Sequence, residues 1–137
     1  MIKKFELDLS SKITILGVEL FRIKALISFG NVEKGELGGY VEKEDNLSHY
    51  GNAWVYGNAW VYGNAEVSKL NDYILFKNTW SSGRYFTYTK SNEMWKVGCF
   101  YGTGEELIKK AYEDSEVSGK HYEAYVNFVK TLEALDN

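Results

Sequence analysis

Apolar residues recur with a period of six through the middle of the chain. Residues 51–68 are three successive hexads that each begin Gly-Asn-Ala, and residues 39–50 continue the same frame in degenerate form. The frame creates two apolar columns: Val41, Leu47, Ala53, Ala59 and Ala65, and then Val55, Val61 and Val67. Strand side chains alternate between faces, so columns two positions apart share a face. We expect both columns to point inward.

A period of six predicts a short left-handed β-helix, in which each hexad makes a strand and a corner and three hexads close one triangular coil. Gly-Asn pairs suit the corners because both residues tolerate positive φ. Two β-hairpins are the alternative, since the same residues favour hairpin turns. Five hexads make fewer than two coils, which is too few to be stable alone. Flanking segments or identical chains must therefore cover the repeat.

Large aromatic residues occupy the positions of the hexads that we expect to face outward. They are Trp54, Tyr56, Trp60 and Tyr62. Exposed aromatic groups are typical of interfaces, so we expect this face to form an interface between copies of the chain. The oligomer that we expect first is a homotrimer. The alternative is that these side chains pack beneath the C-terminal segment of the same chain.

The flanks follow other periods. Alternation within residues 3–28 predicts strands that form an N-terminal β cap over 1–38. After the repeat (39–72), strands are expected at 73–76, 84–90 and 94–100. A capping box at Thr103 and Glu106 predicts a helix to about residue 112, and helical spacing predicts a second over 120–135, with the acidic residues 113–116 in the loop between. The expected fold is mainly β with α: a cap, a β-helix and a C-terminal α+β module over 73–137.

Composition excludes several classes of protein. The 137 residues carry a net charge of −3, which is unlike a basic nucleic-acid coat protein, and they fit one compact unit or two small subdomains. A single cysteine cannot form an internal disulfide, and no apolar run has the length of a membrane span. We expect a cytoplasmic protein that does not bind membranes.

Two stretches resemble small phage and prophage proteins with hexapeptide repeats. One is Leu-Gly-Gly-Tyr-Val-Glu-Lys-Glu-Asp-Asn-Leu-Ser at 37–48 with the hexads that follow, and the other pairs 82–87 (Ser-Gly-Arg-Tyr-Phe-Thr) with 99–103 (Cys-Phe-Tyr-Gly-Thr). The resemblance covers most of residues 20–137. It implies left-handed coils and a phage protein in the cytoplasm of a bacterial host. Most members of the family have no known function, so it implies little chemistry.

The charge is unevenly distributed, and residues 69–100 carry +3 between acidic segments. Within this basic stretch, hydroxyl, guanidinium and aromatic side chains gather in a pattern that suits an anionic, aromatic ligand. The candidate ligand-binding residues are Trp80, Ser81, Ser82, Arg84, Tyr85 and Thr87. Arginine can donate two hydrogen bonds to a phosphate, and Trp or Tyr can stack on a base. The plainer alternative is a hairpin turn with an exposed arginine.

Candidate catalytic residues are few. Hexapeptide-repeat acyltransferases use a histidine as general base, and His49 lies on a hexad, but we expect it to be a surface residue. His121 is expected to be structural, and Cys99 is expected in the core among apolar neighbours. The spacing of these three residues predicts neither a metal site nor a cofactor site.

Three functions remain open. We expect a non-enzymatic phage accessory protein that antagonises host defence by sequestering a small anionic, nucleotide-like ligand in an oligomer. The second is a protein–protein inhibitor or scaffold that contacts a host defence protein through the aromatic face. The third is a degenerate acyltransferase that uses His49.

Overall fold

The computed structural model describes residues 2–136, and within them eight strands form two four-stranded sheets. The first sheet has the order β1-β2-β3-β4, with β1 (Phe5–Ile15), β2 (Val18–Ala25) and β3 (Leu37–Val41) antiparallel and β4 (Trp60–Val61) parallel to β3. The second sheet is antiparallel, in the order β5 (Tyr73–Lys77), β6 (Tyr85–Thr89), β7 (Met94–Val97) and β8 (Phe100–Gly102). A 3-10 turn, η1 (Glu44–Asn46), follows β3, and helices α1 (Gly104–Asp114) and α2 (Glu116–Leu135) end the chain.

The left-handed β-helix predicted for the repeat is wrong. Within the described residues, the repeat after β3 contributes only the two-residue strand β4 and one isolated parallel bridge, between Leu47 and Val67. The repeat is too short to stack coil upon coil, so its backbone pairs with β3 at the edge of a mostly antiparallel sheet. The period of six instead determines burial, because every residue of the two predicted columns is at most 2% exposed.

The aromatic residues of the hexads do not form the exposed face that we expected. Trp54 is fully buried and lies edge-on to Phe29, with ring centroids 5.4 Å apart. Tyr62 contacts the Tyr101 ring of β8 at 4.6 Å. Trp60 is half-buried, and Tyr56 is 41% exposed. The chain itself therefore covers both residues, but only Tyr62 lies against the C-terminal segment, as in the alternative left open above, whereas Trp54 is covered by the N-terminal part of the chain.

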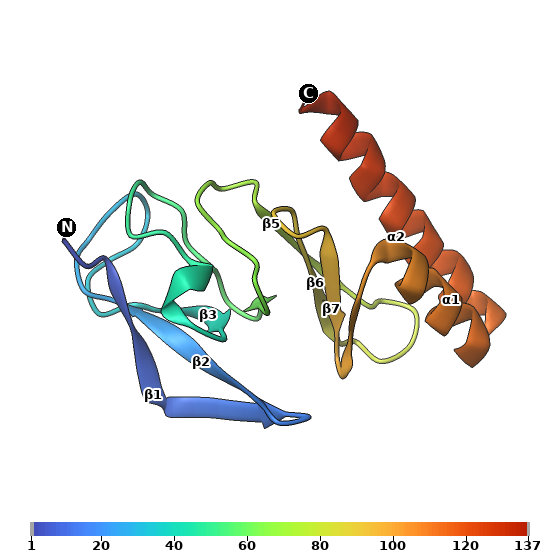
Figure 1. Ribbon diagram of the computed structural model, residues 1–137, viewed down its shortest axis with the longest axis horizontal. Helices are drawn as coiled ribbons and strands as arrows, with labels where there is room; N and C mark the ends of the chain where they lie inside the picture. The colour runs from blue at the N-terminus through green and yellow to red at the C-terminus, as the bar shows by residue number, and fades with distance from the viewer. Residues whose placement is uncertain (1, 137) are drawn as a thin grey trace.

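The first sheet and the repeat share one hydrophobic core and together form the N-terminal unit. The second sheet lies between this unit and the helices (Figure 1). Tyr73 and Leu75 pack against the core of the first unit, whereas Ile74 and Phe76 pack against the core beneath the helices. This arrangement follows from the alternation of strand side chains between the two faces of a sheet. The sheet thus contributes to two hydrophobic cores, one on each face.

The helices begin at side-chain caps. The backbone N–H of Glu106 donates to the Thr103 hydroxyl at 3.2 Å and the Glu106 carboxylate accepts from the Thr103 N–H at 2.9 Å, which confirms the predicted capping box. Helix α2 starts at Glu116 rather than 120, because the Ser115 hydroxyl accepts from the Ser118 N–H at 3.0 Å. The acidic residues 113–116 therefore belong mostly to the helices and not to a loop.

Neither helix has the length and apolar character needed to cross a bilayer, as far as residues 2–136 show.

Candidate functional site

A cleft of about 640 Å³ opens where the first sheet meets the second. Its walls come from three separate parts of the chain. They are the tip of the β1–β2 hairpin (Thr14, Ile15 and Leu16), the repeat around β4 (Asn58 and Trp60), and the second sheet (Arg84, Tyr85, Gly98 and Cys99). A cleft of this volume is in the range that holds a small organic ligand.

The β1–β2 hairpin reaches the cleft because β1 bends sharply. Four residues of β1, Leu9 to Lys12, lie opposite Phe21 alone, and this bulge turns the outer half of the hairpin toward the second sheet (Figure 1). The hairpin closes in a two-residue turn with φ values of 48° at Leu16 and 83° at Gly17. The turn places an apolar tip across from the edge of the second sheet.

Arg84 gives the cleft its charge. Of the described residues that line the cleft, Arg84 alone carries a formal charge, and it forms no salt bridge with any carboxylate of residues 2–136. Its guanidinium lies against Gly98, where an added Cβ would come within 2.4 Å of Nη1. Gly98 also has φ +55°, in the left-handed region that favours glycine. The β7–β8 turn thus supplies a bare backbone surface that the arginine side chain can approach closely.

Aromatic and amide side chains complete the walls. Trp60 is held edge-on to Tyr40, with ring centroids 6.4 Å apart, and its backbone N–H donates to the Thr87 hydroxyl at 3.1 Å. Tyr85 is 42% exposed, and the Lys77 ammonium lies 5.7 Å from the centre of its ring. These two rings offer apolar faces to a planar ligand, while the side chain of Asn58 offers both a donor and an acceptor.

A polar junction between the two units holds the cleft walls in place. The Tyr101 hydroxyl donates to the Tyr62 carbonyl at 3.5 Å and accepts from the Asn92 amide at 3.0 Å. Lys96 is only 4% exposed, and its ammonium lies 4.5 Å from the centre of the Tyr62 ring. Burial lowers the pKa of Lys96 and raises the pKa of Tyr101. The second sheet is therefore attached to the repeat by specific contacts and not only by apolar packing.

The structure separates the six predicted ligand-binding residues. Arg84 and Tyr85 line the cleft, whereas Ser81 and Ser82 line a neighbouring pocket that also contains Arg84. Thr87 is buried beneath Trp60 and is not part of either pocket.

Trp80 likewise lies outside the cleft and packs against α2. Its Nε1–H donates to the Ser118 hydroxyl at 3.2 Å, and its ring stacks on His121 with centroids 4.3 Å apart. Sequence reasoning missed Asn58 and the hairpin tip as cleft residues, and it predicted an interface role for Trp60, which lines the cleft. No local signal marks these residues, because only the bend of β1 and the pairing of β4 bring them together.

The candidate catalytic residues are placed as follows. His49 is not a surface residue, since its side chain is 9% exposed and its ring stacks on Phe5 at 4.3 Å. Its Nδ1 accepts from the Lys4 N–H at 3.0 Å and its Nε2 lies 2.7 Å from a Glu44 carboxylate oxygen. Neither ring nitrogen is free to take a proton from a substrate, which argues against a general base of the acyltransferase type.

Cys99 is exposed at the β7–β8 turn, so its predicted place in the core is wrong. Tight turns project their side chains outward even where the neighbouring strand residues are apolar. Among residues 2–136, no group of three or more histidine, cysteine or acidic side chains could hold a metal ion.

Comparison of the chain with models of known protein families, and with curated proteins, gives no match.

Proposed function

We propose that the protein is a non-catalytic binding protein whose cleft takes a small, planar, anionic ligand of the nucleotide type. The observation that carries the proposal is the state of Arg84. Its guanidinium lies against Gly98 and has no carboxylate partner within residues 2–136, and it shares a cleft with two aromatic rings. An arginine in such a place presents paired N–H donors that match a phosphate or carboxylate.

Each group in the cleft has a part in this binding. The guanidinium of Arg84 donates to the anionic group, and the rings of Trp60 and Tyr85 pack against the planar part of the ligand. The Asn58 amide offers a donor and an acceptor to the edge of a base. The apolar hairpin tip excludes water from one side and so strengthens these polar contacts.

The groups that would bind the ligand all lie in one chain. In the phage setting that the resemblance implies, a protein of this kind acts by sequestering a nucleotide signal used in host defence. The burial of Trp54 and the covering of Tyr62 favour this function over a scaffold that binds through the aromatic face of the repeat.

The test is calorimetric titration with nucleoside monophosphates of the four common bases and their 3′,5′-cyclic forms. At least one is expected to bind, and Arg84→Ala should weaken that binding by about tenfold or more, because a charge-assisted hydrogen bond is lost. Lys34→Ala is the matched control, since it removes an exposed positive charge from the loop between β2 and β3. Absence of binding across the panel, or equal affinities for the wild type and Arg84→Ala, would refute the proposal.

A further inference from the structure

A second pocket lies on the other side of Arg84. It has a volume of about 320 Å³ and lies between the loop that joins β5 to β6, the β7–β8 turn and the facing ends of the two helices. Arg84 and Cys99 line both this pocket and the cleft. The two cavities are therefore neighbours that share one guanidinium.

The second pocket differs from the cleft in its chemistry. Four residues with hydroxyl groups contribute to its lining, and they are Ser81, Ser82, Ser118 and Tyr122. Burial raises the pKa of Tyr122, so its hydroxyl stays protonated at neutral pH. That hydroxyl accepts from the Asn78 amide at 3.4 Å, and within residues 2–136 its own proton has no acceptor. The pocket thus offers a neutral hydrogen-bond donor at Tyr122.

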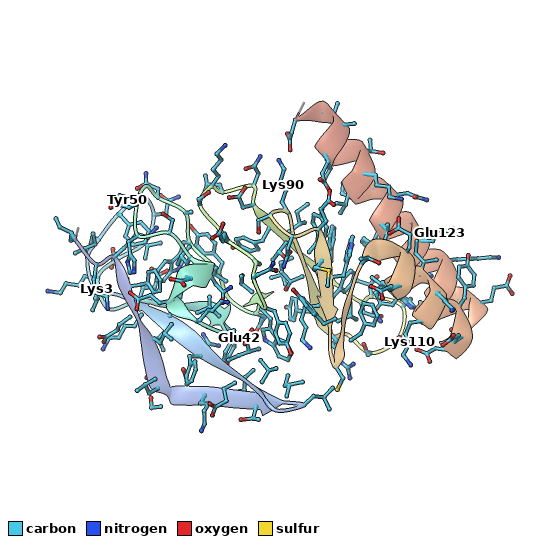
Figure 2. The ribbon with its side chains drawn as sticks, viewed as in Figure 1. Lys3, Glu42, Tyr50, Lys90, Lys110 and Glu123 are labelled. Atoms are coloured by element: carbon cyan, nitrogen blue, oxygen red, sulfur yellow. The ribbon has the colours of Figure 1, made fainter. Side chains whose placement is uncertain are left out.

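Lys110 adds a second positive charge to this pocket. It lies on α1, at the end of the molecule opposite Lys3 in Figure 2. It forms no salt bridge with the carboxylates of residues 2–136. Asp114 is the one acidic residue among the described residues of the lining. With Arg84 and Lys110 opposed by one carboxylate, the pocket favours an anion.

Hydrogen bonds to Asn78 hold the β5–β6 loop, which carries Ser81 and Ser82, in a defined conformation without a ligand. The side-chain oxygen of Asn78 accepts from the Trp80 N–H at 3.2 Å, from the Ser81 N–H at 2.9 Å and from the Ser81 hydroxyl at 3.3 Å. Asn78 is only 4% exposed. A preformed loop lowers the entropy that a ligand must lose to order the site.

From the shared Arg84 we infer that the cleft and the second pocket form one bipartite site for a nucleotide with at least two phosphate groups. The planar base lies in the cleft between Trp60 and Tyr85. The first phosphate meets Arg84, and the next lies among Ser82, Ser118 and Lys110. This inference rests on the proposed function and extends it, since it names the ligand as a nucleoside di- or polyphosphate.

The inference is tested by calorimetric titration of the full chain with nucleoside mono- and diphosphates of the four common bases. For the base that binds, the diphosphate is expected to bind about tenfold more tightly than the monophosphate, which is the effect of one further charge-assisted contact. Lys110→Ala should remove most of this difference, because the charged group among the three around the second phosphate is lost, and its main effect should fall on the diphosphate. Lys109→Ala is the control, because this neighbouring exposed lysine of α1 does not line the pocket.

The outcomes separate the two proposals. Equal affinities of the wild type for mono- and diphosphate, or a full preference for the diphosphate in Lys110→Ala, would overturn the bipartite site while the proposed function stands. If no nucleotide of either class binds, the proposed function fails and the bipartite site fails with it. Both lysines are exposed on a helix surface, so neither substitution should impair folding.

Discussion

The substitution Trp54→Ala tests the burial of the first hexad. The Trp54 side chain has no exposed surface, lies edge-on to Phe29, and sits so close to Gly38 that a Cβ added there would come within 2.8 Å of its ring. Removal of a large aromatic side chain from such a site costs about 3–5 kcal/mol, from lost burial and from the cavity that remains. We expect Trp54→Ala to lower the free energy of unfolding by that amount.

Trp54→Phe should have a much smaller effect, for a reason specific to this site. The indole Nε1–H is buried and has no hydrogen-bond partner among the described residues. Removing it relieves a penalty of about 1–3 kcal/mol. The smaller ring leaves roughly 40 Å³ unfilled, which costs about 1 kcal/mol at 24 cal/mol per Å³. The lost burial of the removed ring atoms costs about 1 kcal/mol more. The total cost of about 2 kcal/mol lies in the middle of the range of the relief, so the change should be within about 1 kcal/mol of zero.

Urea denaturation followed by far-ultraviolet circular dichroism measures both variants without relying on tryptophan fluorescence. Trp60→Ala serves as the comparison, because Trp60 occupies the same position of the next hexad but is only half-buried. If Trp54→Ala costs less than about 1 kcal/mol, Trp54 is not a core residue. If Trp54→Phe is as harmful as Trp54→Ala, the argument from the unpartnered N–H is wrong.

Three further predictions concern turns and caps. Gly98→Ala should destabilise the fold by about 1 kcal/mol, because alanine is strained at a φ of 55°. It should also weaken nucleotide binding in titrations, because the new Cβ displaces the Arg84 guanidinium from its place against Gly98. Unchanged affinity would show that Arg84 does not depend on this contact. Leu16→Asn should raise the free energy of unfolding, measured by urea denaturation, by about 1 kcal/mol. Leu16 is 78% exposed and has a φ of 48°, which asparagine tolerates better. A loss of stability would contradict the positive φ at this position of the turn. Hydrogen bonds from Thr103 lower the pKa of Glu106 below its ordinary 4.5, so the stabilisation from this cap is present above about pH 4.5 and is lost as the pH falls. Glu106→Gln should therefore make the decrease in unfolding free energy at acid pH shallower. Identical pH profiles of the wild type and the variant would count against the cap.

The elements that sequence predicted best are those specified by local interactions. The capping box fixes the start of α1 because Thr103 and Glu106 are three residues apart and bond each other. The strands β5 and β6 lie close to their expected positions, since alternation and turns act within a few residues. The single strand expected at 94–100 is wrong, because a turn at Gly98 and Cys99 divides it into β7 and β8. The prediction starts α2 at residue 120, which is four residues too late, because it does not take the Ser115 side chain as the N-cap of the helix.

The hexads show where local reasoning stops. Trp54 and Trp60 occupy identical Gly-Asn-Ala-Trp-Val-Tyr contexts, yet one is fully buried against the N-terminal unit and the other lines the cleft. Their different environments come from partners distant in the chain, Phe29 in one case and Thr87 in the other. The period could therefore predict which residues face the core but not which sheet they join.

The candidate site divides in the same way. Arg84 and Tyr85 are adjacent in a basic, aromatic stretch, so composition alone drew attention to them. Asn58 repeats the residue found at the same place of the hexads on either side, and nothing in its own hexad distinguishes it. Its part in the cleft depends on how β1 bends and how β4 pairs, which are properties of the assembled fold.

The position of the second sheet also bears on how the protein is made. Phe86 and Trp95 face the helix side of this sheet and are almost completely buried. Since both helices follow the sheet in the chain, a ribosome delivers these strands before anything can cover them. A nascent polypeptide halted before α2 would expose both rings to water and invite association with other chains or with a chaperone. The proposed ligand binding should accordingly appear only after the helices have covered this sheet.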